Sequence, residues 1–233
     1  MAAIIPNVKK IAILRANALG DFIYVLPALK ALKETYPKAQ LIYLGKPWHK
    51  AFLEKRPEIV DRVIVVPVSQ GVREETGEKE DYGELKNFLK EMKKEQFDIA
   101  IQLHGGGKYS NPFTANLGAK LTLGLATPDA LALDISVPYI YYQHEVLRYL
   151  EVVSLIGAKT NAITPQIKVS PEDILEARKV VGSNSKPYIV LHPGATDRRR
   201  RWDTGKFAAV GNLLSKAHYR VFITGTHEES ELV

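Results

Sequence analysis

The first clear pattern along the chain is a short apolar run that gives way to a helical repeat. The run Ile11–Leu14 is continuously apolar, which is typical of a strand buried on both faces of a parallel sheet. Apolar side chains then recur at helical spacing from Phe22 to Tyr36, with charged residues on the opposite face. The pattern predicts a strand, a tight turn and a helix that stops at Pro37.

The same alternation continues along the chain. Further strands are predicted at 41–44, 63–66, 98–103, 121–125, 188–191 and 220–225. Helices are predicted at 48–55, 85–92, from Pro112 onward, and at 145–156, 171–181 and 204–217. Strands that alternate with helices imply an α/β fold, in which a parallel sheet is covered by helices on both faces.

A change of composition divides the chain. Residues 159–171 are predicted to form a linker with one short extended piece at 166–169, and the polar segment 69–82 a mobile loop. We expect an N-terminal domain at residues 1–160, and a linker with the beginning of a second domain at 161–233. The second run supplies only about two strands, and two strands cannot bury a sheet. This favours a chain that is the front part of a longer protein.

Composition narrows the class of protein. The 233 residues are 45% hydrophobic and 25% charged, an ordinary balance for a globular protein, and the absence of cysteine excludes disulfides. We expect neither a signal peptide nor a membrane span. The net charge of +6 favours anionic partners, namely nucleotides, phosphorylated sugars or an anionic membrane surface. No basic stripe interleaved with aromatic residues is present, so nucleic acid is not an expected partner.

Several catalytic classes lack their motif. The first strand is not followed by Gly-x-Gly-x-x-Gly, and no Gly-x-x-x-x-Gly-Lys-Ser/Thr occurs, which disfavours a dinucleotide oxidoreductase and a P-loop nucleotidase. No serine lies in a nucleophile-elbow context. The six histidines are scattered without ligand spacing, so no metal site is predicted.

The turn Arg15–Asp21 is the first candidate for chemistry. Gly20 would allow the backbone to turn without a Cβ penalty. Asp21 stands where a helix N-cap is expected, so it could simply accept hydrogen bonds from free helix N–H groups. The turn also follows the first parallel strand, at the edge where open α/β sheets bind ligands, and there the carboxylate could act as a general base.

A second strand-end turn begins at His104. The three glycines Gly105–Gly107 would allow a ligand to approach the backbone closely, and Ser110 or Asn111 would cap a helix from Pro112. The alternative is a plain flexible loop.

Two turns in the last third of the chain suit a nucleotide. The segment His192–Trp202 offers the N–H groups of a glycine turn, the Thr196 hydroxyl and a run of four arginines that suits phosphate. The alternative for each arginine is a solvated surface. In Gly225–Glu229, the carboxylates could accept hydrogen bonds from ribose or sugar hydroxyls, or could be ordinary acids at a helix start.

Together these segments resemble one family. The matching pieces are Arg15-x-x-x-Leu19-Gly20-Asp21, Pro27-x-Leu29-x-x-Leu32, Pro37-x-Ala39, Gln102-Leu103-His104-Gly105, His144-x-x-x-Arg148-Tyr149-Leu150, His192-Pro193-Gly194-Ala195, Arg200-Arg201-Trp202 with Phe207, and Gly225-Thr226-His227-Glu228-Glu229. In this order they resemble glycosyltransferase family 9, the heptosyltransferases of lipopolysaccharide core assembly.

The resemblance implies a GT-B fold, with two Rossmann-like domains facing a cleft and the second incomplete in this chain. It implies an inverting, metal-independent transfer of a heptose or similar sugar to a lipopolysaccharide-core or other saccharide acceptor. No cofactor is expected; the co-substrate would be a nucleotide-diphospho-sugar such as ADP-heptose. The enzyme would be cytoplasmic, with peripheral contact at the inner face of the cytoplasmic membrane as a further expectation.

The resemblance also implies roles for particular residues. Asp21 would be the catalytic base. The donor diphosphate would be bound by Thr196, Arg200, Gly194 and Arg198, where Arg200 stands at a position that is often lysine in the family. The nucleoside would be bound by Glu228 or Glu229. The acceptor side would comprise Arg15, Asn17, Gly20, His104, Gly105 and Lys108.

One departure from the family pattern leaves a second hypothesis open. The family's late Asp-x-Gly-x-x-His segment, which binds the donor, does not occur in the chain. The alternative function is therefore a non-catalytic half-enzyme that holds a saccharide or an anionic lipid and lacks a complete donor site.

Overall fold

A computed structural model describes residues 3–75, 77–182, 186–195 and 197–232; the side chain of Glu228 lies outside this description. The chain divides into two compact units, residues 1–167 and 168–233. The predicted boundary between residues 160 and 161 stays a prediction.

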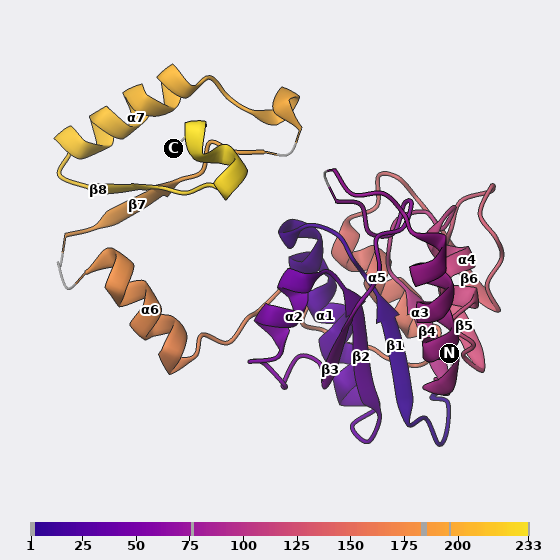
Figure 1. Ribbon diagram of the computed structural model, residues 1–233. Helices are drawn as coiled ribbons and strands as arrows, with labels where there is room; N and C mark the ends of the chain where they lie inside the picture. Colours follow the sequence, from indigo (N-terminus) through magenta and orange to yellow (C-terminus); the bar gives the residue numbers. More distant parts are fainter. Residues whose placement is uncertain (1–2, 76, 183–185, 196, 233) are drawn as a thin grey trace. The chain divides into compact units, whose positions relative to one another are not determined.

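The first unit is built on one parallel sheet (Figure 1). Its strands are β1 (Lys10–Leu14), β2 (Gln40–Gly45), β3 (Arg62–Val65), β4 (Ile99–Gln102), β5 (Leu121–Ala126) and β6 (Ile135–Pro138). Within the described residues they lie in the order β3-β2-β1-β4-β5-β6, and every neighbouring pair is parallel. The order reverses at β1, so the turns after β1 and β4 lie side by side at the carboxyl edge.

Helices cover both faces of this sheet. They are α1 (Leu19–Thr35), α2 (Pro47–Leu53), α3 (Tyr82–Lys94), α4 (Ser110–Ala115) and α5 (Glu145–Ser154). Side chains alternate along β1, so Ile11 and Ile13 face the core shared with α1, α2 and α5, whereas Ala12 and Leu14 face the core shared with α3 and α4. Burial on both faces explains why β1 is continuously apolar.

The second unit is smaller. It contains α6 (Pro171–Val181), β7 (Tyr188–Leu191), the 3₁₀ turn η1 (Arg198–Arg200), α7 (Thr204–Lys216), β8 (Arg220–Ile223) and the 3₁₀ turn η2 (His227–Leu232). Strands β7 and β8 are parallel neighbours. The turn after each of them therefore lies at the same edge, and these are the two turns that the sequence marks for a nucleotide.

Three local predictions are wrong. Helix α1 begins at Leu19, so Asp21 is its third residue and not its N-cap. Gly20 lies inside this helix without a positive φ, so the turn does not depend on it. Helix α4 begins at Ser110, before the predicted start, and its N-cap is Tyr109.

One strand was not predicted. Strand β6 at Ile135–Pro138 is a strand that the sequence did not reveal, whereas the predicted linker around 166–169 contains no strand or helix. This strand is four residues long and ends in proline, so it offers little apolar pattern. Among the described residues, no helix has the length and apolar composition needed to cross a bilayer.

Removal of one buried hydroxyl tests this packing. The Tyr36 hydroxyl donates to the Ile156 carbonyl oxygen at 2.5 Å and accepts from the Ile5 amide at 3.2 Å. Tyr36→Phe should lower the free energy of unfolding by about 1–3 kcal/mol, because both backbone groups lose a partner. Urea denaturation measures the change. Tyr82→Phe, at a side chain that is 78% exposed, is the control and should leave stability unchanged.

Candidate functional site

A buried guanidinium lies at the centre of the site in the first unit. Arg15 directly follows β1, and only 2% of its surface is exposed. Its Nη1 donates to the Leu103 carbonyl oxygen at 2.7 Å, and its Nη2 donates to Asp21 Oδ1 at 2.9 Å. The guanidinium also lies 4.8 Å from the centre of the Tyr149 ring. Burial lowers the pKa of Arg15, and the negative charge of Asp21 opposes this, so the ion pair is what permits the burial.

Asp21 remains partly accessible. Its Oδ1 accepts from Arg15 and its Oδ2 accepts from the Ala18 amide at 3.2 Å, which fixes both oxygens. The side chain is nevertheless 37% exposed. A carboxylate held from two sides and open to solvent on another is arranged to receive a proton from a bound hydroxyl.

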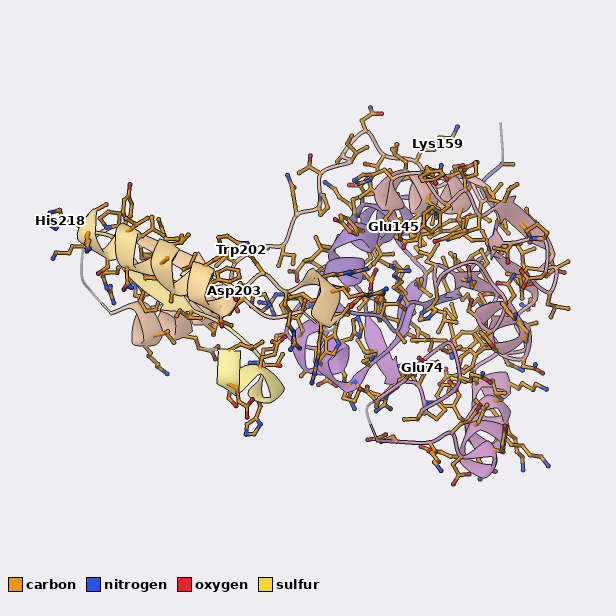
Figure 2. The ribbon with its side chains drawn as sticks, turned by 90° about the horizontal axis from the view of Figure 1, so that it is seen from above. Glu74, Glu145, Lys159, Trp202, Asp203 and His218 are labelled. Atoms are coloured by element: carbon orange, nitrogen blue, oxygen red, sulfur yellow. The ribbon has the colours of Figure 1, made fainter. Side chains whose placement is uncertain are left out.

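Glu145 is a site residue that the sequence did not reveal. It is the first residue of α5 (Figure 2), a position where an acid is ordinarily explained by the helix dipole. In the structure its Oε2 lies 3.5 Å from Arg15 Nη2. Its carboxylate also accepts hydrogen bonds from Arg148 Nη1 and from the Tyr149 hydroxyl. Burial raises the pKa of Glu145, with Arg15 acting against this and Asp21 with it. The sequence signal that could have indicated Glu145 is the family-matching segment His144-x-x-x-Arg148-Tyr149-Leu150, in which Glu145 lies.

His104 lies against the same turn. Its Nδ1 accepts from the Ala16 amide at 3.2 Å, which joins the turn after β4 to the turn after β1. Burial, followed by the positive charge of Arg15, lowers the pKa of His104 to about 3. His104 is therefore neutral at physiological pH and acts as an acceptor for the backbone.

The glycine turn is held by packing and hydrogen bonds, which argues against the alternative of a plain flexible loop. Gln102 is fully buried, and its Nε2 donates to the carbonyl oxygens of His104 at 2.7 Å and Gly105 at 3.2 Å. Gly107 has a φ of +96°, and a Cβ there would lie 2.5 Å from Asn111 Nδ2. This glycine is thus required by backbone conformation and by packing. Gln102 and Asn111 are further residues that the sequence did not assign to the site.

The remaining acceptor-side candidates differ in their surroundings. Asn17 is half-buried, and its Oδ1 is shielded from solvent and has no hydrogen-bond partner within the described part of the chain. Gly20 is exposed on the first turn of α1. Lys108 has a 63% exposed side chain and lies 3.6 Å from Asp129. Arg15, Asp21 and His104 are therefore gathered around one turn, whereas Lys108 pairs with an acid on the neighbouring loop.

The turn after β7 sorts the four arginines into two kinds. Arg199 is bound to the Asp197 carboxylate, at 2.8 Å from Nη2 to Oδ2, and Arg201 Nε donates to the Ala195 carbonyl oxygen at 2.8 Å. Arg198 and Arg200 are exposed, and no ion pair of either is found among the described residues. Thr196 lies outside the described residues. The turn leads into α7, whose cap Asp203 follows Trp202 (Figure 2).

The acidic turn after β8 folds back onto this glycine turn. Glu229 Oε2 accepts from the amide and the hydroxyl of Thr226, at 2.9 and 3.1 Å. The backbone hydrogen bond lowers the pKa of Glu229. A Cβ on Gly194 would lie 2.3 Å from the Glu229 carboxyl carbon, so glycine makes room for it. The side chain of Glu228 lies outside the described residues.

A hollow of about 340 Å³ adjoins these two turns in the second unit. It is lined by Leu191, Pro193, Thr204, Gly205, Phe207, Ala208, Ile223, Glu231 and Leu232. Among the described residues, no group of three or more histidine, aspartate or glutamate side chains is placed to hold a metal ion.

Solved structures share this architecture. A glycosyltransferase family 9 protein from Veillonella parvula aligns with a TM-score of 0.76 at 20% identity, covering 99% of this chain and 67% of that one. The ADP-heptose lipopolysaccharide heptosyltransferase II of E. coli aligns with a TM-score of 0.73 at 20% identity, over 96% of this chain and 66% of that one. At this identity the matches show the fold, which is the α/β fold of GT-B glycosyltransferases.

The chain belongs to glycosyltransferase family 9 (heptosyltransferase), whose family model matches residues 85–233. Lipopolysaccharide heptosyltransferase 2 of Salmonella typhimurium is 26% identical over 95% of this chain, and lipooligosaccharide heptosyltransferase 2 of Haemophilus ducreyi is 23% identical over 94%. The chain spans 65% and 64% of the length of these two relatives. The family resemblance drawn from the sequence is thereby confirmed.

Burial of His104 predicts a pH dependence of stability. The folded pKa of about 3 lies below the pKa of about 6.5 expected for an unfolded histidine, so only the unfolded state takes up this proton in between. Stability should therefore fall as the pH drops below about 6.5. His104→Asn keeps an acceptor for Ala16 and should reduce the slope of unfolding free energy against pH by up to about 1.4 kcal/mol per pH unit. Urea denaturation between pH 5.5 and 7 measures it.

The control for this test is His218→Asn. His218 is exposed and has a φ of +66°, a conformation that asparagine tolerates well. This variant should keep the slope of the parent protein. An unchanged slope in His104→Asn would contradict the assignment of His104 as a buried neutral histidine.

Proposed function

We propose that this chain carries the acceptor-side domain and nucleotide-sugar-binding residues of an inverting, metal-independent heptosyltransferase. The sugar would pass from a nucleotide-diphospho-heptose such as ADP-heptose to a lipopolysaccharide-core or related saccharide acceptor. The names of the relatives support the transfer, and a solved heptosyltransferase with 18% identity holds ADP-2-deoxy-2-fluoro heptose. The observation that carries the proposal is the partly exposed Asp21 carboxylate held by the buried Arg15 at the carboxyl edge of the sheet.

The reaction is a single displacement. Asp21 accepts the proton of an acceptor hydroxyl as that oxygen bonds to the anomeric carbon. The bond from the anomeric carbon to the diphosphate oxygen breaks at the same time, and the nucleoside diphosphate leaves with that electron pair. Attack on the face opposite the leaving group inverts the anomeric configuration.

The negative charge of the leaving diphosphate would be neutralised by residues of the second unit. The exposed Arg198 and Arg200, with the N–H groups near Gly194 and the Thr196 hydroxyl, would neutralise it. Arginine forks placed for this role replace what a metal ion supplies in other transferases. The neighbouring hollow of about 340 Å³ would take the nucleoside, with Glu228 or Glu229 toward the ribose.

The acceptor would bind at the turns after β1 and β4. Asn17, with its unpartnered Oδ1, and the exposed Lys108 offer polar groups to saccharide hydroxyls or phosphates. Gly20, His104 and Gly105 shape the surface around Asp21. A lipid-linked acceptor and the net charge of +6 favour a cytoplasmic enzyme in peripheral contact with an anionic membrane.

The base is tested by Asp21→Asn in the natural full-length protein. Transfer from ADP-heptose to truncated lipopolysaccharide should fall by about 10²–10⁴ in kcat, because the amide cannot accept the hydroxyl proton. Donor affinity by calorimetry and thermal unfolding should stay close to the parent values. Glu34→Gln, at an exposed position of the same helix, is the control. Unchanged turnover in Asp21→Asn would contradict the assignment of Asp21 as the base. Binding of a saccharide or an anionic lipid by the parent, without donor binding or turnover, would favour the non-catalytic alternative.

The diphosphate site is tested by Arg200→Ala. The dissociation constant for ADP-heptose should rise by about 10- to 100-fold, as expected for loss of a charge-assisted hydrogen bond. Arg199→Ala is the matched control, since Arg199 is already bound to Asp197. Calorimetry with ADP-, UDP- and GDP-sugars measures both variants and identifies the nucleotide. Equal affinities in the two variants would contradict the role given to Arg200.

A further inference from the structure

One nitrogen of Arg15 serves two carboxylates. Nη2 lies 2.9 Å from Asp21 Oδ1 and 3.5 Å from Glu145 Oε2. Asp21 belongs to α1 and Glu145 to α5, two helices that pack together on the same face of the sheet. The single guanidinium charge is therefore shared between two carboxylates of similar side-chain exposure, 37% for Asp21 and 29% for Glu145.

Glu145 is held more firmly than a helix-start acid requires. Arg148 Nη1 and the Tyr149 hydroxyl both donate to its carboxylate, and the side chain of Arg148 is 1% exposed. Arg148 Nη2 in turn donates to three backbone groups of the segment before α5, the carbonyl oxygens of Ile140, Tyr141 and Gln143. The Glu145 carboxylate is thus held in place by buried side chains.

The groups that face Glu145 come from three elements. Arg15 comes from the end of β1, Asp21 from α1, Arg148 and Tyr149 from α5 itself, and the cap His144 precedes it. The two negative carboxylates, of Asp21 and Glu145, equal in number the two positive guanidinium groups, of Arg15 and Arg148. Burial of such a cluster is costly unless each charge has a partner, so the removal of one charge redistributes the others.

Resting on the proposed role of Asp21 as base, we propose that Glu145 is a positioning residue for the transfer reaction. By competing for Arg15 Nη2 it keeps the guanidinium in place and limits how strongly Arg15 neutralises Asp21. Without the Glu145 charge, Arg15 would act on Asp21 alone. The ionised carboxylate would then be stabilised, and a stabilised carboxylate is a weaker base.

Glu145→Gln tests this in the full-length protein, with ADP-heptose and truncated lipopolysaccharide. The acidic limb of the kcat profile should move to lower pH by about one unit, because loss of a negative neighbour favours ionisation of the base. On the plateau kcat should fall by about tenfold, while the KM for ADP-heptose stays unchanged. Glu145→Asp keeps the charge but draws the carboxylate back from Arg15, so its acidic limb should lie between that of the parent and that of Glu145→Gln.

Glu151→Gln is the matched control. Glu151 is an exposed acid on the same helix, and its carboxylate accepts a hydrogen bond from Gln143 Nε2 at 2.8 Å. This variant should keep the parent kcat and pH profile. If Glu145→Gln behaves like Glu151→Gln while Asp21→Asn is inactive, the positioning role falls and the proposed function stands. If Asp21→Asn keeps its turnover, the proposed function itself falls.

A purely structural role for Glu145 gives a different result. If Glu145 only stabilises the fold, Glu145→Gln would lower the folded fraction of the protein, and kcat in proportion, without moving the acidic limb of the pH profile. Should Glu145→Gln fail to fold, Glu145→Asp decides the question, because its carboxylate is drawn back from Arg15. A limb shifted part of the way supports the proposal, and an unshifted limb overturns it.

Discussion

The buried guanidinium of Arg15 is the interaction on which the first unit depends. A charge with 2% exposure is tolerated only where partners compensate it, and Arg15 finds them on three separate elements. It reaches the Leu103 carbonyl oxygen after β4, Asp21 on α1, and Glu145 and Tyr149 on α5. One side chain thereby joins the elements at the carboxyl edge of the sheet and sets the position of the partly exposed Asp21 carboxylate.

The turn after β4 completes this edge by backbone hydrogen bonds. Gln102 holds the carbonyl oxygens of His104 and Gly105, and His104 accepts from the Ala16 amide of the neighbouring turn. Neutral His104 suits a place beside Arg15, since a second cation there would be repelled. The glycines that look like a mobile, ligand-accommodating loop are instead required by close packing, as at Gly107.

In the second unit, the four arginines of the turn after β7 differ in their partners. Arg199 and Arg201 hold Asp197 and the Ala195 carbonyl oxygen, which shapes the turn after β7. Arg198 and Arg200 are exposed, and neither has an ion pair among the described residues. Glu229, read from sequence as a group for the nucleoside, already bonds Thr226 and packs over Gly194, so any contact it makes with a ribose has to use its remaining acceptor capacity.

The sequence by itself determined the alternation of strands and helices, the family and the edge at which the site lies, because apolar period and turn position are local properties. Runs such as Ile11–Leu14 could hardly be anything but buried strands. It could not find β6, whose pattern is too short, nor distinguish Asp21 as a cap from Asp21 as the third residue of α1. Only the tertiary structure decided that Glu145 shares Arg15 with Asp21, since that contact joins residues far apart in the chain, and no local pattern records the burial that makes their charges interact.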